Sequence, residues 1–423
     1  MRQNFVGPVS RRRFLRLMPL AGAISVLAPP LMRAAPKRPC RLLLRSSWQT
    51  VNIGDIGHTP GVIQLLAEHL PEVEITLWPS NIGNGVEEML RHNFPRLRFA
   101  QSPEELKKAF GECDFLLHGS GPSLVGQKQL SQWRQQTGKP YGIFGITFSS
   151  HDAETHEVIN GARFCYFRDS VSLQFARNQG LTCPVMEFGP DGAFGCKLRN
   201  EQAASAFLRA HDLKAGRFLC VIPRLRYTPY WKIHGKPMTA EDQRKQARSE
   251  ARKEHDHAPL REAIVAIARQ TECRVLVCPE DQSQMAVGKE MLVDPLPEDV
   301  KQRVVWREHY WLTDEALSTY VRSAGLFGLE MHSPIMCVGN GIPAIVCRFQ
   351  EQTSKGFMWR DIGLGDWLFD MDQEKDVRQI TPAVLTLARD PAATLAKTAK
   401  ARAFVHRRQR EMILTLRQHL NLP

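Results

Sequence analysis

Short apolar runs alternate with amphipathic, helix-like segments along almost the whole chain, and this alternation restricts the possible folds more than any other feature. The runs are rich in Val, Ile, Leu and Phe, and apolar residues recur at spacings of three and four between them. Buried strands joined by helices form a parallel sheet with helices on both faces. The pattern therefore predicts an α/β fold.

The alternation comes in two series, which indicates two lobes. Apolar runs of the first series lie within residues 41–188, and those of the second lie within residues 218–348. A chain of 423 residues is also long enough for more than one domain of ordinary size. We expect two Rossmann-like lobes, each with a parallel sheet, and a cleft between them. The expected parts are residues 36–200, residues 201–390 and a basic C-terminal helix over residues 391–423.

A polar stretch over residues 224–257 interrupts the second series. It is rich in Lys, Arg, Glu and His, which favours either a mobile loop or a solvated helix. Amphipathic spacing returns after this stretch and predicts a helix that begins near Pro259.

The first 35 residues have the features of an export signal. Arg11, Arg12 and Arg13 precede Phe14, and a weakly apolar stretch follows that is too short and too rich in proline to span a membrane. We expect a twin-arginine signal that uses the twin-arginine translocase of a bacterium. The mature protein would then be periplasmic or otherwise exported, and cytoplasmic if the signal is not used. The alternative is a basic, frayed N-terminal arm.

The charge and the cysteines narrow the classes of ligand. Half of the formal net charge of +12 comes from six arginines in the first 35 residues, so the remaining bias suits anionic ligands but gives no argument for nucleic acid. The ten cysteines contain no Cys-x-x-Cys pair, and their spacing matches neither a zinc ribbon nor an iron–sulfur motif. We therefore expect no metal centre, and the pairing of any disulfides is left open.

Ligands of doubly wound sheets bind beyond the carboxyl ends of the strands, so we expect the ligand-binding residues directly after each apolar run. After the first run, Asp55 offers a carboxylate in a glycine-rich turn that also contains Asn52. Thr59 and Pro60 can begin a helix whose free N–H groups attract an anion. The alternative is a plain strand-to-helix turn with an Asn or Asp cap.

Three further turns of the first lobe follow predicted strands. The small residues Gly119, Ser120 and Gly121 can place a phosphate or carboxylate against backbone amides, although alone they also fit a generic turn. Their spacing does not match the nucleophile motif of serine hydrolases. The pair Arg168-Asp169 is more typical of a clamp at a helix N-terminus than of a catalytic unit. Asp191, at another strand end, is better placed for the cleft.

The second lobe contributes cations and a histidine. Arg224 and Arg226 come directly after a strand, and arginine suits bidentate binding of carboxylate or phosphate. His332 lies between a strand end and a helix start, where it can serve as a hydrogen-bond donor or as an acid. A lone histidine is more often structural, but the position of His332 among glycines, within reach of Arg348 and Lys355, makes it a better candidate than most.

In their order along the chain these motifs resemble the polysaccharide pyruvyl transferase family. The resemblance extends over residues 41–370 and rests on the ordered set, because each motif alone is weak. The set comprises Asn52-x-Gly54-Asp55, His118-Gly-Ser-Gly121-Pro-Ser123, Arg168-Asp-Ser170, Pro190-Asp191, Arg224, and His332-Ser followed by Gly341-x-Pro343 and Lys355.

The resemblance implies a two-lobed fold like that of the GT-B glycosyltransferases. It also implies transfer of pyruvate from phosphoenolpyruvate, the co-substrate, to two hydroxyls of a cell-envelope glycan, which leaves a ketal and phosphate. No metal or further cofactor is implied. The catalytic residues would be His332 as the acid, with Asp55 or Asp191 as the proton acceptor. Donor binding would involve Arg224, Lys355, Ser333, Gly119, Ser120 and Gly121, and acceptor binding would involve Asn52 and Asp55.

Two features depart from the family pattern. Family members commonly carry an arginine two residues before the histidine, whereas this chain has Glu330. Its charge would oppose binding of an anionic donor unless it pairs elsewhere, for example with Arg348 or Arg360. An export signal would also separate the enzyme from phosphoenolpyruvate, a cytoplasmic metabolite, so the donor could be another small anion. Two alternatives therefore stay open: a glycosyltransferase-like enzyme with a nucleotide-sugar donor, and an exported, non-catalytic glycan-binding relative.

Overall fold

The computed structural model describes residues 38–46, 49–149, 152–420 and 422. Residues 39–423 form one compact unit. The predicted export signal over residues 1–35 lies outside the described residues. Among the helices of the described part, none is long and apolar enough to cross a membrane. Nine of the ten cysteines are buried, and Cys40 is half-buried.

The first sheet has seven parallel strands in the order β3-β2-β1-β4-β5-β6-β7. Its central strands are buried on both faces, which explains why their sequences are continuous apolar runs rather than alternating ones. The strands are β1 Arg41–Arg45, β2 Glu74–Leu77, β3 Arg98–Phe99, β4 Phe115–His118, β5 Tyr141–Ile146, β6 Cys165–Phe167 and β7 Met186–Phe188. The helices are α1 Ile53–His69, α2 Val86–Asn93, α3 Pro103–Glu112, α4 Gln127–Thr137, α5 Ala153–Asn160, α6 Ser170–Asn178 and the 3-10 turn η1 Gly192–Gly195.

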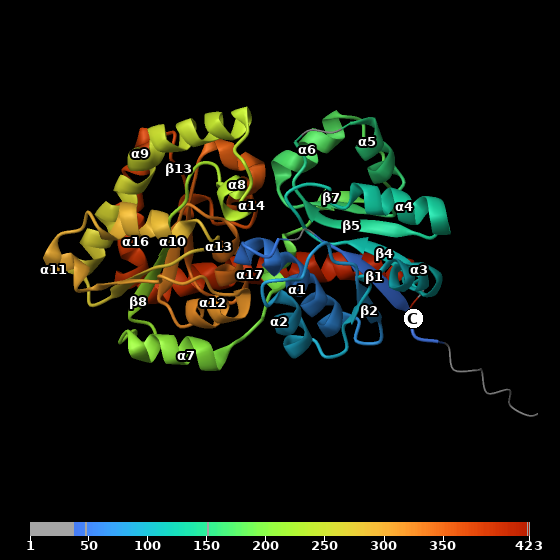
Figure 1. Ribbon diagram of the computed structural model, residues 1–423, viewed down its shortest axis with the longest axis horizontal. Helices are drawn as coiled ribbons and strands as arrows, with labels where there is room; N and C mark the ends of the chain where they lie inside the picture. Colours follow the sequence, from blue (N-terminus) through green and yellow to red (C-terminus); the bar gives the residue numbers. More distant parts are fainter. Residues whose placement is uncertain (1–37, 47–48, 150–151, 421, 423) are drawn as a thin grey trace, which may run out of the picture. The chain divides into compact units, whose positions relative to one another are not determined.

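The second sheet, whose strands β8 and β13 are labelled on the left in Figure 1, is parallel throughout. Its six strands have the order β10-β9-β8-β11-β12-β13. Counted from its own first strand, this is the doubly wound Rossmann order. The strands are β8 Phe218–Ile222, β9 Arg274–Val277, β10 Val304–Trp306, β11 Gly325–Gly328, β12 Ala344–Arg348 and β13 Leu368–Asp370. The prediction of an α/β fold with two Rossmann-like parallel sheets is confirmed.

Helices of several lengths surround the second sheet and continue to the C-terminus. The longer ones are α7 Glu201–Ala210, α9 Ala240–Gln270, α12 Thr313–Tyr320, α13 His332–Gly339, α16 Ile380–Arg389 and α17 Pro391–His419. The shorter ones are α8 Tyr230–Ile233, α10 Gln284–Gly288, η2 Lys289–Val293, α11 Glu298–Lys301, η3 Gln350–Phe357, α14 Met358–Asp361, η4 Gly365–Trp367 and α15 Glu374–Val377.

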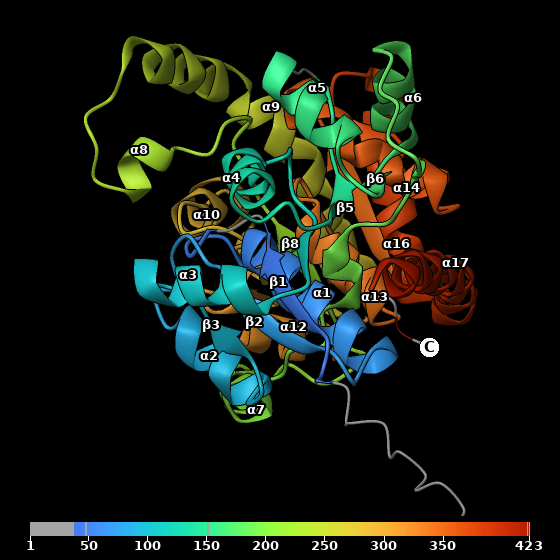
Figure 2. The ribbon, with the colours of Figure 1, turned by 90° about the vertical axis from the view of Figure 1, so that its right-hand side faces the viewer.

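The polar stretch before the predicted Pro259 helix is largely helical. Thr239 and Asp242 form a capping box, so α9 begins at Ala240 and continues through Pro259 to Gln270. Its first half is mostly exposed and lacks the apolar face from which a helix can be predicted, whereas its second half packs on the sheet. The prediction of a helix start near Pro259 was therefore wrong. Figure 2 shows α8 and the first turns of α9 projecting from the second lobe.

Helix α17 contacts both halves of the unit (Figure 1). It packs against α13 of the second half and α1 of the first. Towards its end, Thr415 hydrogen-bonds the Tyr166 hydroxyl of β6, and Arg408 pairs with Glu187 of β7. Val405, Met412 and Leu416 form its buried stripe. The C-terminal helix therefore links the two sheets across the region where they meet.

Candidate functional site

The segment after β1 begins α1 earlier than the sequence predicted. Asn52 is the N-cap, and its side-chain oxygen accepts hydrogen bonds from the backbone N–H groups of Gly54, at 2.8 Å, and Asp55, at 3.1 Å. The helix therefore starts at Ile53, and Thr59 and Pro60 lie inside it. The expected start at Thr59-Pro60 was wrong because Asn52 supplies a stronger cap. The acceptor-binding role of Asn52 stays a prediction, and its side-chain oxygen already serves the helix.

This first turn of α1 lies directly on the second lobe. Ile53 donates its N–H to the Glu280 carbonyl at 2.9 Å, and Gln282 donates to the Val51 carbonyl at 3.1 Å. Gly54 is needed at this contact, because a Cβ there would lie only 2.3 Å from Cβ of His332 and 2.7 Å from Oε1 of Glu280. The carboxyl ends of β1, β9 and β11 are thereby brought together.

His58, one turn into α1, is fully buried and held by its Nδ1 atom. Nδ1 lies 2.8 Å from Oδ1 of Asp191 and 2.7 Å from Oγ of Ser120. Ser120 also donates to Asp191 at 3.2 Å and accepts from the Gly192 N–H at 3.0 Å. Because a carboxylate only accepts, Nδ1 carries the hydrogen, and Nε2 is left with a lone pair. Nε2 of His58 has no hydrogen-bond partner among the described residues.

Asp191 is the carboxylate that orients His58. It is completely buried, and it also accepts from Nη1 of Arg168 at 2.7 Å and from the Ala193 N–H at 2.9 Å. Burial opposes ionisation, but the interactions with His58 and Arg168 outweigh it and hold the pKa of Asp191 well below its usual range. A carboxylate with so low a pKa is a weak base, so its surroundings fit the orientation of His58 better than direct proton acceptance.

Arg168 and Asp169 have different roles: Asp169 caps a helix, and Arg168 binds Asp191. Asp169 caps α6 by accepting from the Ser172 N–H at 2.8 Å, as a clamp at a helix N-terminus does. Arg168 turns the other way, towards Asp191 and Thr147. The clamp interpretation therefore describes Asp169, while Arg168 fixes the carboxylate behind His58.

His332 is the first residue of α13 and faces His58 from the second lobe. The two ring centroids are 4.7 Å apart, with the rings nearly perpendicular. Nδ1 of His332 lies 3.4 Å from Oε1 of Glu280, and Nε2 has no hydrogen-bond partner in the described part of the chain. Burial, together with the positive charge of Lys355, lowers the pKa of His332 well below its usual value, so the ring is neutral at rest.

Glu280 stabilises the beginning of α13. Its Oε2 accepts both the N–H and the hydroxyl of Ser333, each at 2.7 Å. Ser333, which we predicted to bind the donor, therefore already uses both donors within the protein. Its donor-binding role stays a prediction.

Glu330 pairs with the predicted donor-binding residue Arg224. Nη1 of Arg224 lies 2.7 Å from Oε2 of Glu330, and Gln284 donates to the other carboxylate oxygen at 2.7 Å. The expected partners were wrong: Arg348 pairs with Asp370, and Arg360 lies over the Phe357 ring. The reason is the strand order, since β8 and β11 are neighbours and their ends place Arg224 beside Glu330. Burial raises the pKa of Glu330 to about 7 despite the attraction of Arg224.

Lys355 approaches the same group of charges from η3. Burial and the nearby Arg224 lower the pKa of Lys355, while Glu330 and Glu280 act in the opposite direction. A second carboxylate, Asp281, is also buried there, and burial together with Glu330 raises its pKa to about 6. The predicted cations Arg224 and Lys355 thus lie together, but among acidic side chains.

The turn over residues 119–121 uses its amides within the fold. Gly119 donates its N–H to the Arg45 carbonyl at 2.7 Å, and Gly121 donates to the Gly145 carbonyl at 3.4 Å. Ser120 serves the His58–Asp191 pair instead. The donor-binding role of the three residues stays a prediction, and the bonding seen here gives it no support.

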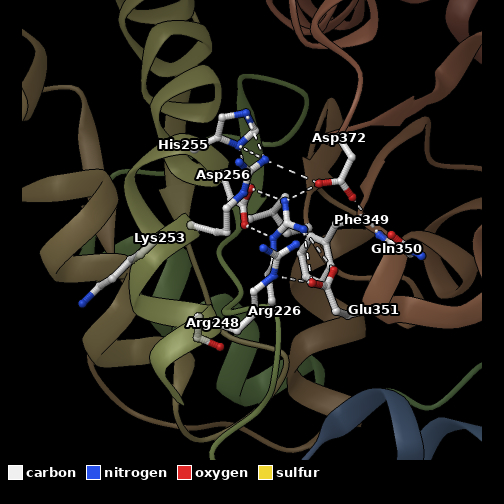
Figure 3. A network of polar contacts seen from close by, with 12 residues as sticks. Arg226, Arg248, Lys253, His255, Asp256, Phe349, Gln350, Glu351 and Asp372 are labelled. Atoms are coloured by element: carbon white, nitrogen blue, oxygen red, sulfur yellow. Dashed lines mark hydrogen bonds and ion pairs between the residues drawn. The ribbon is translucent and has the colours of Figure 1, made fainter. Parts of the chain in front are cut away.

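Arg226 has a structural environment, unlike Arg224. Figure 3 shows its guanidinium among three carboxylates from separate elements. It forms a bidentate pair with Asp256 of α9, at 2.8 and 2.9 Å, and reaches Glu351 at 3.0 Å and Asp372 at 2.7 Å. It also lies over the Phe349 ring. The cluster joins the end of β8 to α9 and to the segments on either side of β13, and so supports the elements that carry Arg224 and Lys355.

Asp55 completes the site at the junction of the lobes. It is 9 % exposed, and one ligand atom each of Asp55, His58 and His332 lies within 4.8 Å of the others. His58 and Glu280 were not among the site residues predicted from the sequence. A signal existed for His58, because it follows Asp55 by three residues and therefore shares its helix face.

A surface pocket of about 740 Å³ lies beside α1, β2 and the turn after α2. None of the site residues named above lines this pocket.

Comparison with known proteins agrees with this architecture. The family model of polysaccharide pyruvyl transferase matches residues 52–350. No curated protein matches the chain. Among solved structures, MnaA of S. aureus with UDP has a TM-score of 0.56 at 10% identity, over 90% of this chain and 97% of that one.

Two further structures have a similar likeness. The UDP-GlcNAc 2-epimerase of Neisseria meningitidis bound to UDP-GlcNAc gives a TM-score of 0.54 at 8% identity, over 89% of this chain and 100% of that one. UGT2 of Phytolacca americana, complexed with UDP-2fluoro-glucose and pterostilbene, gives 0.56 at 11% identity, over 90% and 99% of the two chains. At these identities the likeness shows the fold alone, and it confirms the expected GT-B-like arrangement.

Proposed function

Because the chain belongs to the polysaccharide pyruvyl transferase family, we propose that it transfers pyruvate from phosphoenolpyruvate to two hydroxyls of a cell-envelope glycan. The observation that carries the proposal is the meeting of His58 and His332 from opposite lobes, each with an unpaired Nε2 atom. Two adjacent imidazoles held this way offer a proton donor and a proton acceptor to one substrate.

The reaction needs one proton delivered and two removed. Protonation of the methylene carbon of phosphoenolpyruvate makes its central carbon electrophilic, and the first sugar hydroxyl adds there and loses its proton. The bond from that carbon to the phosphate oxygen then breaks and phosphate leaves. The second hydroxyl takes its place and loses its proton, which completes the ketal. The balance of one proton leaves with the phosphate.

The residues divide these tasks between the lobes. His332, once protonated, is the acid that serves the methylene carbon, and the two negative charges of the donor favour its protonated form. His58 accepts the hydroxyl proton at Nε2, and Asp191 stabilises the resulting cation from the opposite edge of the ring. Asp55 lies beside both rings, where it can accept a hydrogen bond from a sugar hydroxyl.

Donor binding depends on Arg224 and Lys355. Nε of Arg224 has no hydrogen-bond partner within the described residues, so part of its guanidinium remains for a carboxylate or phosphate. Glu330 takes the other part. We therefore expect weaker binding of the donor than an unopposed arginine would give.

A phosphate-release assay with phosphoenolpyruvate and a panel of acceptor glycans tests the proposal. Release should require both substrates. Arg224→Ala should raise KM for the donor about 10-fold or more through the lost charge-assisted bond, and His332→Ala should abolish detectable turnover. The exposed His309, which lies outside the site, provides the matched control His309→Ala. Phosphate release that survives both site substitutions would refute the assignment of these residues.

The pairing of Arg224 with Glu330 also favours a second candidate, an exported glycan-binding protein that no longer turns over a donor. In that case glycans would bind to the purified chain, while neither phosphoenolpyruvate nor a nucleotide sugar would be consumed. The nucleotide-sugar alternative has only the likeness of folds to support it.

We also propose that residues 1–35 direct export through the twin-arginine pathway. The motif of Arg11 and Arg12 before Phe14 supports this. Changing Arg11→Lys together with Arg12→Lys should retain the chain in the cytoplasm, as cell fractionation would detect. Mature protein outside the inner membrane despite both changes would show that the segment is not such a signal.

A further inference from the structure

We propose that Asp55, His58 and His332 form a binding site for a divalent transition-metal ion, of which Zn²⁺ is the best match. The inference goes beyond the proposed transferase function, which uses no metal. It depends on the same buried junction of the two lobes, but not on the identity of the donor or the acceptor.

The three side chains already converge. One ligand atom of each lies within 4.8 Å of the other two. In a tetrahedral zinc site with bonds of ~2.0–2.1 Å the ligand atoms are ~3.4 Å apart, so a movement of about 1 Å would close the site.

The two histidines are prepared as ligands. Both are buried, at 0% and 3% exposure, and Nε2 of each lacks a hydrogen-bond partner among the described residues. Nδ1 of His58 is held by Asp191 at 2.8 Å, and Nδ1 of His332 faces Glu280 at 3.4 Å. A carboxylate behind the ring is the outer shell that metal-binding histidines usually have, and Asp191 behind His58 fixes the tautomer that leaves Nε2 free.

The ligand types and the charge select the metal. Two imidazole nitrogens and one carboxylate suit Zn²⁺ and similar transition metals, whereas Mg²⁺ and Ca²⁺ prefer a shell of oxygen atoms. Asp55 in the site, with Asp191 and Glu280 behind the rings, provides negative charge against a dication. Three protein ligands would also leave one position open for water or for a substrate oxygen.

Metal binding and proton transfer exclude each other at these atoms. A histidine Nε2 holds either a proton or a metal ion, so a bound metal removes both His58 and His332 from acid–base chemistry. We therefore expect the metal-bound protein to be inactive in phosphate release and to regain activity when a chelator removes the ion.

Calorimetric titration of the chelator-treated, purified chain with ZnCl₂ tests the site directly, together with elemental analysis of the dialysed product. One equivalent of Zn²⁺ should bind. His58→Ala, His332→Ala and Asp55→Asn should each weaken binding about 100-fold or more, while His309→Ala should leave it unchanged. Cys40→Ser should also leave it unchanged, because Cys40 is the cysteine outside the buried set and could bind zinc nonspecifically.

Cobalt substitution identifies the ligands by a signal independent of activity. With Co²⁺ we expect visible bands of a nitrogen and oxygen site, without the near-ultraviolet charge-transfer band of a thiolate. The wild-type visible bands should be lost in His58→Ala and His332→Ala, with the unfolding midpoint of each variant measured to show that it is folded.

Two outcomes would overturn the inference: no stoichiometric binding of Zn²⁺ or Co²⁺, or binding that persists in folded His58→Ala and His332→Ala variants. Full turnover by a protein with one equivalent of bound Zn²⁺ would refute the expected exclusion. Metal binding without any turnover of phosphoenolpyruvate would instead leave this site standing and count against the transferase function. Turnover without metal binding would do the reverse.

Discussion

Replacing His58 by alanine should lower kcat for phosphate release by about 10²–10⁴-fold, the usual contribution of a positioned general base. The substitution removes the Nε2 lone pair that Asp191 orients from behind the ring. KM for phosphoenolpyruvate should change little, because the predicted donor-binding cations Arg224 and Lys355 lie on the second lobe. Steady-state kinetics with saturating acceptor would separate the two effects.

The matched control for this experiment is His309→Ala, since the His309 side chain is 83% exposed and belongs to no buried cluster. The Asp191→Asn variant adds a second test, because it keeps the shape while weakening the support of the His58 cation, so kcat should again fall. Unfolding midpoints of all variants should be recorded. Turnover of the His58→Ala protein within threefold of the wild type would rule out the base assigned here.

Replacing Arg226 by methionine should lower the free energy of unfolding by about 3–5 kcal/mol. The change removes the arginine that contacts Asp256, Glu351 and Asp372, and the Asp256 side chain is only 2% exposed. A buried carboxylate without its partner retains its desolvation cost and loses the attraction that offset it. Urea denaturation of the purified chain at neutral pH would measure the loss.

Arg248→Met is the control for Arg226, because Arg248 also contacts Glu351 but is 50% exposed. It should cost less than about 1 kcal/mol, as solvated ion pairs do. The double variant Arg226→Met with Asp256→Leu should recover part of the stability, since no unpaired charge then remains at that position. A loss below 1 kcal/mol for Arg226→Met alone would contradict a central structural role for the cluster.

Local sequence patterns predicted much of the fold, because the signals for strands and helices depend on residues that are close together in the sequence. Apolar runs marked most strands, and amphipathic spacing predicted helices such as α6 over Ser170–Asn178. Amphipathic spacing does not predict a helix that has no apolar face, such as the first half of α9. The predicted start was also wrong at α1, where the Asn52 cap begins the helix before Thr59 and Pro60.

The candidate site was only partly accessible from the sequence. Asp55, Asp191 and His332 were predicted, and they lie around one junction, as does the missed His58. Arg224 was predicted as a donor-binding cation, yet Glu330 occupies one end of its guanidinium. The error has a physical cause: the partner of a charge depends on which strands are neighbours, and the wrong arginines were chosen because strand order was not yet known.

The sequence by itself therefore determined the two series of strands and helices, the family, and the residue types that any chemistry must use. Hydrophobic periodicity and helix caps act over a few residues, so they can be read directly from the chain. The tertiary structure alone decided that His58 faces His332, that Asp191 and Glu280 stand behind these rings, and that Glu330 pairs with Arg224. These contacts join residues far apart in the chain, and they exist only because the carboxyl ends of two separate sheets are packed together.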